Sequence, residues 1–297
     1  MFDLRRLQFL REVASRGTIS AAAEALAYTP SAVSQQLTVL EREVGAPLLE
    51  RRGRNVVLTP AGEVLVAHSD AVLDAVEAAS AAVAGVTDEI AGRLDLGSFQ
   101  SAAVSLLPRA LRTLRDEHPN LDARLVLPPL EDAVRELRLG TLDIAVDQRY
   151  CHVPHNRHDG LDLTSLFTER LFVLSPADDP VATLADAAHR HFVMSPTHVE
   201  CGRSVSALCA TMGFEPDVRH HVEDFEATRA IVAAGLAVAV LPELALVGAM
   251  PGIHVATVPD AHREVVAVIR PASAGRRVVQ AGIEHLEKAA TSLPVVV

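Results

Sequence analysis

A chain of 297 residues can bury more than one hydrophobic core, so we expect two or three domains. Its net charge is −11, but the charge is uneven: residues 1–65 hold eight arginines against seven acidic residues, whereas the remainder carries a net charge of −12. The larger part is therefore unsuited to non-specific polyanion binding, and any nucleic-acid contact falls to the N-terminal segment.

The cellular compartment can be predicted from the cysteines and the apolar segments. Three cysteines are too few for a disulfide framework and favour a reducing cytoplasm. The N-terminus shows no apolar core of a secretory signal. The apolar stretch 230–253 is interrupted by Gly235, Pro242 and Glu243, so a helix followed by a buried strand explains it better than a membrane span. We expect a cytoplasmic protein without membrane contact.

The first part of the chain predicts three short helices. Apolar residues recur at helical spacing over residues 4–14, and an alanine-rich segment at 19–26 predicts a second helix. Thr29 and Pro30 start a third, because threonine can cap a helix and proline at its first position lacks only an N–H that the helix does not use. This helix runs to the residue before Gly45, a common terminator.

The third predicted helix has an apolar face, with Val33, Leu37 and Leu40, and a polar face opposite it. The polar face carries short hydrogen-bonding groups and no carboxylate, which suits a helix lying in a DNA major groove. An ordinary solvated face is the alternative, but such faces usually carry glutamate and lysine. The residues that we expect to face DNA are Thr29, Pro30, Ser31, Ser34, Gln35 and Thr38.

A two-stranded hairpin is predicted directly after this helix. Leu48 and Leu49 precede, and residues 56–58 follow, a glycine-containing turn. Arginines at the tip of such a hairpin would lie along the DNA backbone or enter the minor groove. These arginines are Arg51, Arg52 and Arg54.

Thr59 and Pro60 repeat the helix-start signal and open a longer helix, to about Glu89. At ~1.5 Å per residue it would be about 45 Å long, more than the small N-terminal unit can cover. Its seam alternates spacings of four and three, which favours pairing with a second subunit, although packing on the C-terminal part is the alternative. The seam positions are Leu65, Ser69, Val72, Val76, Ala79, Val83, Val86 and Ile90.

From about residue 92 onward, strand and helix patterns alternate, which predicts an α/β architecture with largely parallel sheets. The loop 150–160 predicts a crossing between two lobes. Expected strands are 94–99, 123–127, 142–146, 170–174, 192–194, 218–222, 236–241 and 265–269; expected helices are 102–117, 130–139, 205–212, 226–234 and 276–290.

Residues 1–60 resemble the winged helix-turn-helix of LysR-type transcriptional regulators, and the chain length and later α/β pattern extend the resemblance more loosely to the whole chain. The matched blocks at fixed spacing include Ala22-Ala23-Glu24-Ala25-Leu26, Pro30-Ser31-Ala32-Val33-Ser34, Val44-Gly45-Ala46-Pro47-Leu48-Leu49-Glu50-Arg51 and Leu58-Thr59-Pro60-Ala61-Gly62. Ala21 and Thr38 stand where the family often has basic residues, which implies weaker or more salt-sensitive DNA binding.

The resemblance implies an α/β protein with an N-terminal all-α winged helix-turn-helix, a long linker helix and a two-lobed, periplasmic-binding-protein-like effector domain. Its implied parts are 1–59, the DNA-binding domain with the helix-turn-helix at 18–37; 60–90, the dimerising linker helix; and 91–297, the effector-binding domain, with lobe I at about 91–162 plus 267–297 and lobe II at about 163–266. The implied function is transcription regulation at promoter DNA, controlled by a small molecule bound between the lobes. The implied partners are double-stranded DNA, a small effector that could be anionic, and further copies of the chain in a homodimer or homotetramer, with no cofactor.

Two segments that follow strands of different lobes are candidates for effector contact. Both look like helix N-termini with a composition that could cradle a small anion. The same side chains could equally be plain helix caps and turn residues. The candidates are Gln100 and Ser101 in the first segment, and Ser195, Thr197 and His198 in the second.

Two alternatives to an effector-controlled regulator stay open. A metal- or redox-responsive regulator could use the loop residues Cys151, His152, His155 and His158 with His198, Cys201 and Cys209, but the spacings match no firm metal motif, so we predict no metal site. A DNA-binding enzyme would need catalytic residues. The chain has no G-x-S-x-G, no glycine-rich phosphate loop and no H-E-x-x-H, so we predict no catalytic residues and no enzyme activity.

Overall fold

The computed structural model describes residues 3–26, 28–53, 55–84, 89–129, 132–154, 158–248 and 250–293. The chain divides into two compact units, Met1–Val86 and Thr87–Val297, and each is described by itself. Within the described ranges no helix combines the length and apolar character that a membrane crossing needs.

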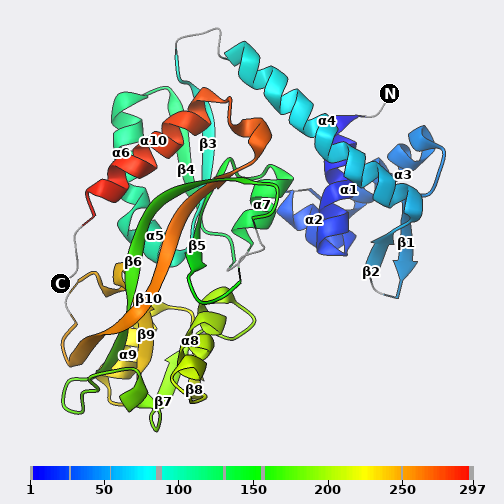
Figure 1. Ribbon diagram of the computed structural model, residues 1–297. Coiled ribbons are helices and arrows are strands. Elements are labelled where there is room, and N and C mark those ends of the chain that lie inside the picture. The colour runs from blue at the N-terminus through cyan, green and yellow to red at the C-terminus, as the bar shows by residue number, and fades with distance from the viewer. Residues whose placement is uncertain are drawn as a thin grey trace. The chain divides into compact units, whose positions relative to one another are not determined.

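The first unit is a helical bundle with a β-hairpin and one long helix (Figure 1). Its elements are α1 (Leu4–Arg16), α2 (Ile19–Ala25), α3 (Pro30–Val44), β1 (Leu49–Arg52), β2 (Asn55–Leu58) and α4 (Pro60–Ala84). One apolar core holds these elements together. It is formed by Leu7, Phe9, Leu10, Val13, Ala22, Ala23, Val33, Leu37, Leu40 and Leu48.

The predicted bounds of α3 are confirmed, because they rest on local capping. The Thr29 hydroxyl oxygen accepts a hydrogen bond from the backbone N–H of Ala32 at 3.2 Å, and Pro30 occupies the first helical position. Gly45 follows the last turn with φ of 77°, a left-handed conformation that costs glycine little. The buried residues of α3 are the predicted Val33, Leu37 and Leu40.

Helix α4 begins at Pro60 as predicted, and the Thr59 hydroxyl caps it by accepting from the N–H of Gly62 at 3.1 Å. Gly62 is required here, because a Cβ at this position would lie 2.2 Å from the carbonyl oxygen of Leu48. The described helix ends at Ala84, and the seam position Val86 falls outside the described residues. Ile90 does not belong to the seam: it lies beyond the helix and packs against the core of the second unit.

The second unit is a mixed α/β fold around a six-stranded sheet with the order β4-β3-β5-β10-β6-β9, and a smaller parallel pair, β7-β8. Its strands are β3 (Gly92–Gly97), β4 (Leu121–Val126), β5 (Ile144–Tyr150), β6 (Asp162–Pro176), β7 (His191–Met194), β8 (Asp217–His221), β9 (Ala239–Pro242) and β10 (Ile253–Ile269). Its α-helices are α5 (Gln100–Ser105), α6 (Leu107–Glu117), α7 (Ala133–Leu139), α8 (Glu200–Thr211), α9 (Phe225–Ala233) and α10 (Arg277–Thr291), and short 3-10 turns follow β9 at Glu243–Leu246 and precede α10 at Pro271–Ser273.

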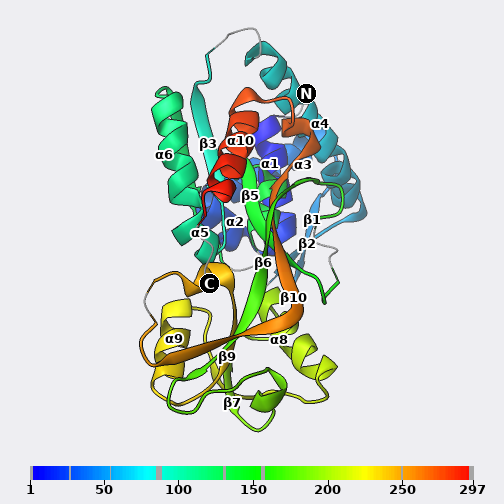
Figure 2. The same ribbon diagram turned by 60° about the vertical axis from the view of Figure 1, so that its left-hand side comes forward.

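The prediction of largely parallel sheets is wrong for the middle of the large sheet. Strands β4, β3 and β5 are parallel, but β10 pairs antiparallel with both β5 and β6, and β9 pairs antiparallel with β6. The strands β6 and β10 are long, and the sequence pattern indicated only their continuously apolar parts. Figures 1 and 2 show both strands running the length of this unit.

These two strands connect two apolar layers of the second unit. Val265 and Phe167 pack in one core with β3, α6 and α10, whereas Leu171 and Val258 pack in another with β7 and α8. Tyr150, the last residue of β5, belongs to the second core, and Leu161, just before β6, packs against a further apolar cluster that contains Leu137 and Val266. The crossing expected at residues 150–160 is therefore made chiefly by the paired strands.

One predicted helix, 102–117, is two helices, α5 and α6. Pro108 explains the break, because proline has no N–H to continue the hydrogen bonds of α5, whereas at the start of α6 that N–H is not needed. Leu106 is accordingly both the last cap of α5 and the first cap of α6. The core beneath them needs close approaches: a Cβ at Gly97 would lie 2.3 Å from Leu142, and one at Gly282 2.6 Å from Ile144.

Candidate functional site

The polar face of α3 is presented to solvent. Its predicted DNA-facing residues are all exposed, whereas the apolar residues on the other side of the helix have no more than 3% exposed surface. The helix is therefore held rigidly from behind while its outer face stays open. The exposed set is Thr29, Pro30, Ser31, Ser34, Gln35 and Thr38.

The hydroxyl groups on this face are not equally available. The Thr38 hydroxyl donates to the carbonyl oxygen of Ser34 at 3.0 Å, so toward an outside group it is an acceptor. The Thr29 hydroxyl oxygen already accepts the capping bond, so its hydrogen is the part left to donate. The amide of Gln35 and the hydroxyls of Ser31 and Ser34 can each both donate and accept a hydrogen bond.

Two carboxylates at the end of α3 are used inside the fold. Glu41 accepts hydrogen bonds from the backbone N–H groups of Leu48 and Leu49, at 2.8 and 3.3 Å. Glu43 forms an ion pair with Arg6 of α1. Neither role could be read from the helical pattern, and together they keep negative charge away from the exposed face.

The hairpin of β1 and β2 forms the predicted wing, with Gly53 at its turn in a left-handed conformation, φ of 64°. Arg51 and Arg52 are both exposed. Arg52 lies 3.6 Å from Glu50, but with side chains 76% and 52% exposed this pair restrains the arginine little. Arg54 falls outside the described residues. The wing can thus offer at least two cations to phosphate.

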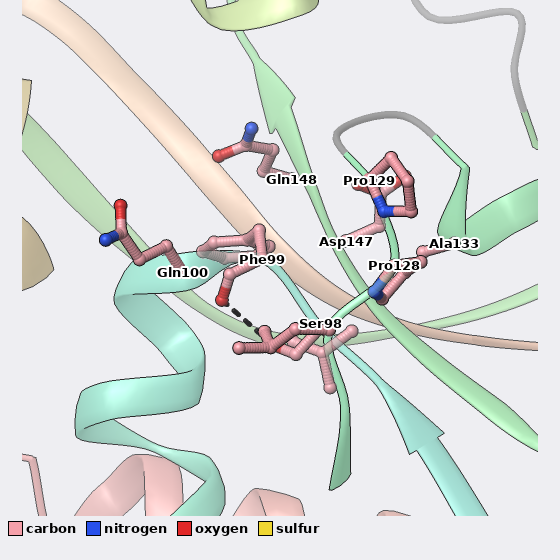
Figure 3. Close-up of a pocket in the computed structure, with 10 residues that line it drawn as sticks. Ser98, Phe99, Gln100, Pro128, Pro129, Ala133, Asp147 and Gln148 are labelled. Carbon is pink, nitrogen blue, oxygen red and sulfur yellow. Dashed lines mark hydrogen bonds between the residues drawn. The ribbon is translucent and has the colours of Figure 1, made fainter. Parts of the chain in front are cut away.

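A cavity of about 130 Å³ lies in the second unit where β3, β4 and β5 end. Strand β3 has β4 on one side and β5 on the other, so the chain changes direction across the sheet here, the place where open α/β sheets bind ligands. Figure 3 shows Gln100 on the helix side of the cavity and Pro128 and Pro129 on the other. The lining residues are Ser98, Phe99, Gln100, Leu127, Pro128, Pro129, Ala133, Val146, Asp147 and Gln148.

The polar side chains of this cavity are fixed by partners. Asp147 accepts from His158 at 2.9 Å, and both are buried. Gln100 donates through Nε2 to Asp224 at 2.6 Å and accepts from the N–H of Phe225 at 3.4 Å. Asp224 caps α9, so Gln100 ties α5 to the start of α9 in the other layer. A ligand that contacts Gln100 can therefore alter the hydrogen bonds that join the two layers.

Ser101 has a different place from Gln100. Only 3% of its surface is exposed, and its hydroxyl oxygen accepts from Nη2 of Arg263 at 2.7 Å. It does not line the cavity at the strand ends. It lines a smaller one of about 70 Å³ near the start of α9, which Gln100 also lines.

The buried Arg263 behind Phe99 was not predicted as a functional residue. Its guanidinium lies 4.8 Å from the Phe99 ring centre and donates to Glu169 at 2.7 Å, and to Gln148. Burial disfavours its charge, but the ion pair with Glu169 and the interaction with Tyr150 outweigh that cost, so the pKa of Arg263 is raised. Burial also disfavours the charged form of Tyr150. It therefore raises the pKa of Tyr150 well above its ordinary value, and the hydroxyl keeps its proton.

The second predicted effector segment is not a helix N-terminus. Helix α8 begins at Glu200, after Ser195, Thr197 and His198, and its first residue brings a buried carboxylate to that end. A carboxyl group in the first turn occupies the place where an added anion would meet the helix N-terminus. Ser195 is buried, Thr197 and His198 are exposed, and none of the three lines the cavities that Gln100 lines.

The described residues of the His- and Cys-rich loop engage separate partners. His152 contacts Ser204 of α8 at 2.8 Å, and His158 pairs with Asp147 instead. His155 falls outside the described residues. Helix α8 carries two thiols, Cys201 and Cys209, and both are buried. Burial raises the pKa of Cys209 to about 12, which disfavours the reactive thiolate.

Comparison with protein families matches both units. A model described as the bacterial regulatory helix-turn-helix protein of the lysR family matches residues 4–63, and one described as the LysR substrate binding domain matches residues 87–291. Among curated proteins, the transcriptional dual regulator GltC of Bacillus subtilis is 30% identical over 246 residues, which cover 81% of each chain.

Solved structures share the fold across nearly the whole chain. A full-length OxyR variant from Pseudomonas aeruginosa matches with a TM-score of 0.68 and 24% identity, covering 99% of both chains. Full-length CbnR in complex with its target DNA matches with a TM-score of 0.56 and 22% identity, covering 97% of this chain and 100% of that chain. At such identities the likeness is one of fold.

Proposed function

The chain belongs to the LysR family of bacterial transcriptional regulators, and from that premise we propose how its residues divide the work. The protein binds DNA through its first unit and responds to a small-molecule effector through its second. In our proposal residues 1–59 are the DNA-binding domain, 60–90 the dimerising linker and 91–297 the effector domain, with lobe I at about 91–162 plus 267–297 and lobe II at about 163–266.

One observation carries the proposal for DNA: α3 presents a face of short polar groups whose nearby carboxylates are occupied elsewhere in the fold. On this helix Ser34 and Gln35 would reach base edges in the major groove, with Ser31 and Thr38 beside them. Arg51 and Arg52 of the wing would contact phosphates, and Arg54 is assigned to the same role. A homodimer or a homotetramer would place the helices of paired subunits on a partly palindromic site.

The DNA proposal is tested with sites selected from fragmented DNA of the source genome, measured by fluorescence anisotropy. Gln35→Ala and Ser34→Ala should each cost ~1–3 kcal/mol on the selected site and little on random DNA. Arg51→Ala and Arg52→Ala should weaken binding to the selected site and to random DNA equally. Each should also reduce the slope of log affinity against log salt concentration by about one. Arg115→Ala, an exposed arginine of the second unit, is the control. Equal losses on both DNAs for Gln35→Ala would remove the base-reading role.

For the effector we propose the cavity at the ends of β3, β4 and β5. Its lining joins an apolar wall, formed by Phe99, Leu127 and Val146, with amide and hydroxyl groups, the usual make-up of a small-molecule site. Gln100 is the predicted effector residue best supported here, since it lines the cavity and holds Asp224. Ser101 does not line this cavity and would affect the effector only through its hydrogen bond with Arg263. Ser195, Thr197 and His198 do not line it either, and their contact with the effector stays a prediction.

A thermal-shift screen of small metabolites tests this assignment, because a ligand that binds only the folded state stabilises it by RT ln(1 + [L]/Kd), about 2.7 kcal/mol at one hundred times Kd. Leu127→Trp should abolish the shift of the best compound by filling the cavity mouth. Leu236→Trp is a matched control, because the two leucines are 58% and 56% exposed. A compound that shifts all three proteins equally would exclude the cavity as its site.

We also infer that the protein works in the cytoplasm, where its DNA lies, and as a regulator without a catalytic role. The matching curated relative is itself a transcriptional regulator. This part of the proposal rests on family membership, and the screen above tests it too: a regulator returns its ligand unchanged, which mass spectrometry of the incubated compound would check.

A further inference from the structure

The helices α6 and α10 of the second unit bring three metal-binding side chains together. The two helices pack side by side (Figures 1 and 2). Glu117 ends α6, His118 follows it, and His285 lies within α10. One ligand atom from each of the three lies within 4.8 Å of the others. This is a separate place from the cavity at the strand ends, and none of its residues lines that cavity.

The geometry needs little adjustment to hold an ion. Bonds of about 2.0–2.2 Å in a tetrahedral arrangement put ligand atoms ~3.3–3.5 Å apart. His285 Nε2 and Glu117 Oε2 are already 3.5 Å apart. The His118 and His285 rings stand edge to face with centres 5.5 Å apart, and His118 is only half buried, so its ring can turn inward.

His285 has a hydrogen-bond partner at Nδ1, the ring nitrogen other than the one that lies near Glu117. This Nδ1 lies 2.8 Å from the hydroxyl oxygen of Thr113, and that hydroxyl has a carbonyl acceptor of its own at Ala110, 3.0 Å away. When the hydroxyl hydrogen goes to that carbonyl, Nδ1 is the ring donor and Nε2 is left free to bind a metal ion. Such an outer hydrogen bond is the usual support of a metal-binding histidine.

The charges around the three side chains are compatible with a cation. His285 has 1% exposed surface, and the carboxylate of Glu117 lies 3.5 Å from its ring. Lys288 lies 3.6 Å from Glu117, where it would compete with an ion. It also pairs with Glu284 at 2.9 Å, so it keeps a carboxylate partner when Glu117 turns to the metal.

We propose that Glu117, His118 and His285 form a binding site for a divalent transition-metal ion of the zinc class, with water at the open position. Two imidazoles and one carboxylate favour Zn²⁺, Co²⁺, Ni²⁺ or Cu²⁺ over Mg²⁺ and Ca²⁺, which prefer all-oxygen sites. The bound ion joins the end of α6 to α10 and so stabilises this layer of the second unit.

Calorimetric titration of the untagged full chain with Zn²⁺, and visible absorption with Co²⁺, test the site. His118→Ala and Glu117→Gln should each lower the affinity at least ~10-fold, and Thr113→Val, which frees the ring of His285, by about 10- to 100-fold. His189→Ala and Glu287→Gln, an exposed histidine and an exposed α10 carboxylate outside the cluster, should leave it unchanged. Mg²⁺ should not compete.

His118 and Glu117 are partly or largely exposed, so their variants should fold, which circular dichroism would verify. Zn²⁺ should raise the melting temperature of the parent chain and of the two control variants but not of His118→Ala. Zinc binding that persists undiminished in both His118→Ala and Glu117→Gln would overturn the proposal, as would a parent chain that binds no Zn²⁺ or Co²⁺.

Discussion

At the scale of single residues, the buried Arg263 of the second unit contacts three elements of the fold at once. Its guanidinium is 1% exposed and contacts Gln148 of β5, Glu169 of β6 and Ser101 of α5. Glu169 in turn accepts from the N–H of Leu244 at 2.6 Å. One buried ion pair therefore links elements of both apolar layers at the place where β6 and β10 cross between them.

Removing one charge of this pair should be costly, because the other charge stays buried without an opposite charge beside it. Glu169→Gln keeps an acceptor for Leu244 but strands the guanidinium, and we expect a loss of about 3–5 kcal/mol in the unfolding free energy of the second unit. The measurement is urea unfolding followed by circular dichroism, since the chain has no tryptophan.

A double variant separates the pair from the packing around it. Glu169→Gln combined with Arg263→Met removes both charges and fills similar space, so it should be more stable than the sum of the two single losses predicts. Strictly additive losses would show that the contacts to Gln148 and Ser101, and not the ion pair, account for the effect.

At the scale of helices and strands, the sequence predicts those features that depend on residues close together in the chain. The start of α3 at Thr29 and Pro30, its end at Gly45 and its buried stripe follow from spacing and capping within fifteen residues. The polar face predicted for DNA is exposed for the same reason. Such local rules do not predict the role of Glu41, whose carboxylate accepts hydrogen bonds from backbone N–H groups seven and eight residues away.

The strands β6 and β10 show where such prediction stops. In β6 the run from Leu171 onward is buried, and that run was predicted, but residues 162–167 are exposed or half-buried and were not. Likewise β10 was predicted from Val265 to Ile269, its continuously buried end. The remaining part of each strand pairs mostly with the apolar part of the other, as in Asp162 with Ile269 and Ile253 with Pro176, and such pairing depends on residues far apart in the chain.

Apart from Gln100, the polar lining of the cavity at the strand ends was missed for the same reason. Ser98, Asp147 and Gln148 come from segments fifty residues apart, and each alone looks like an ordinary polar residue at the end of a strand. Parallel strands with a helix between them bring their carboxyl ends to one edge, so Asp147 and Gln148, just past the apolar start of β5, carried a usable signal. The second segment, with Ser195, was expected at the start of a helix, whereas α8 begins only at Glu200, after its cap Val199.

At the scale of the whole molecule, α4 divides into two parts with different surroundings. Near its start Leu65 and Val66 pack on the core of the first unit, and Ser69 is 1% exposed. Further along, the seam residues Val72, Val76 and Val83 are 44%, 42% and 73% exposed. Valines repeating at heptad spacing on an open helix face are the pattern that a second helix covers.

The small positive charge of the first sixty-five residues makes this pairing important for function. A net charge of +1 allows few phosphate contacts for one subunit, so one copy should bind DNA weakly. Two copies joined through α4 bind the second half-site as an intramolecular event, which can raise the overall affinity by about 100-fold or more without a new contact.

We therefore expect Val72→Glu combined with Val76→Glu to weaken self-association and DNA binding together. Sedimentation velocity should show smaller species at low micromolar concentration, and anisotropy on the selected site should show an affinity lower by about 100-fold. Ala67→Glu with Ala71→Glu adds the same charges to exposed positions off the seam and should change neither quantity. If the seam variant kept both its assembly and its affinity, subunits would have to pair elsewhere, and the exposed valines of α4 would need another partner.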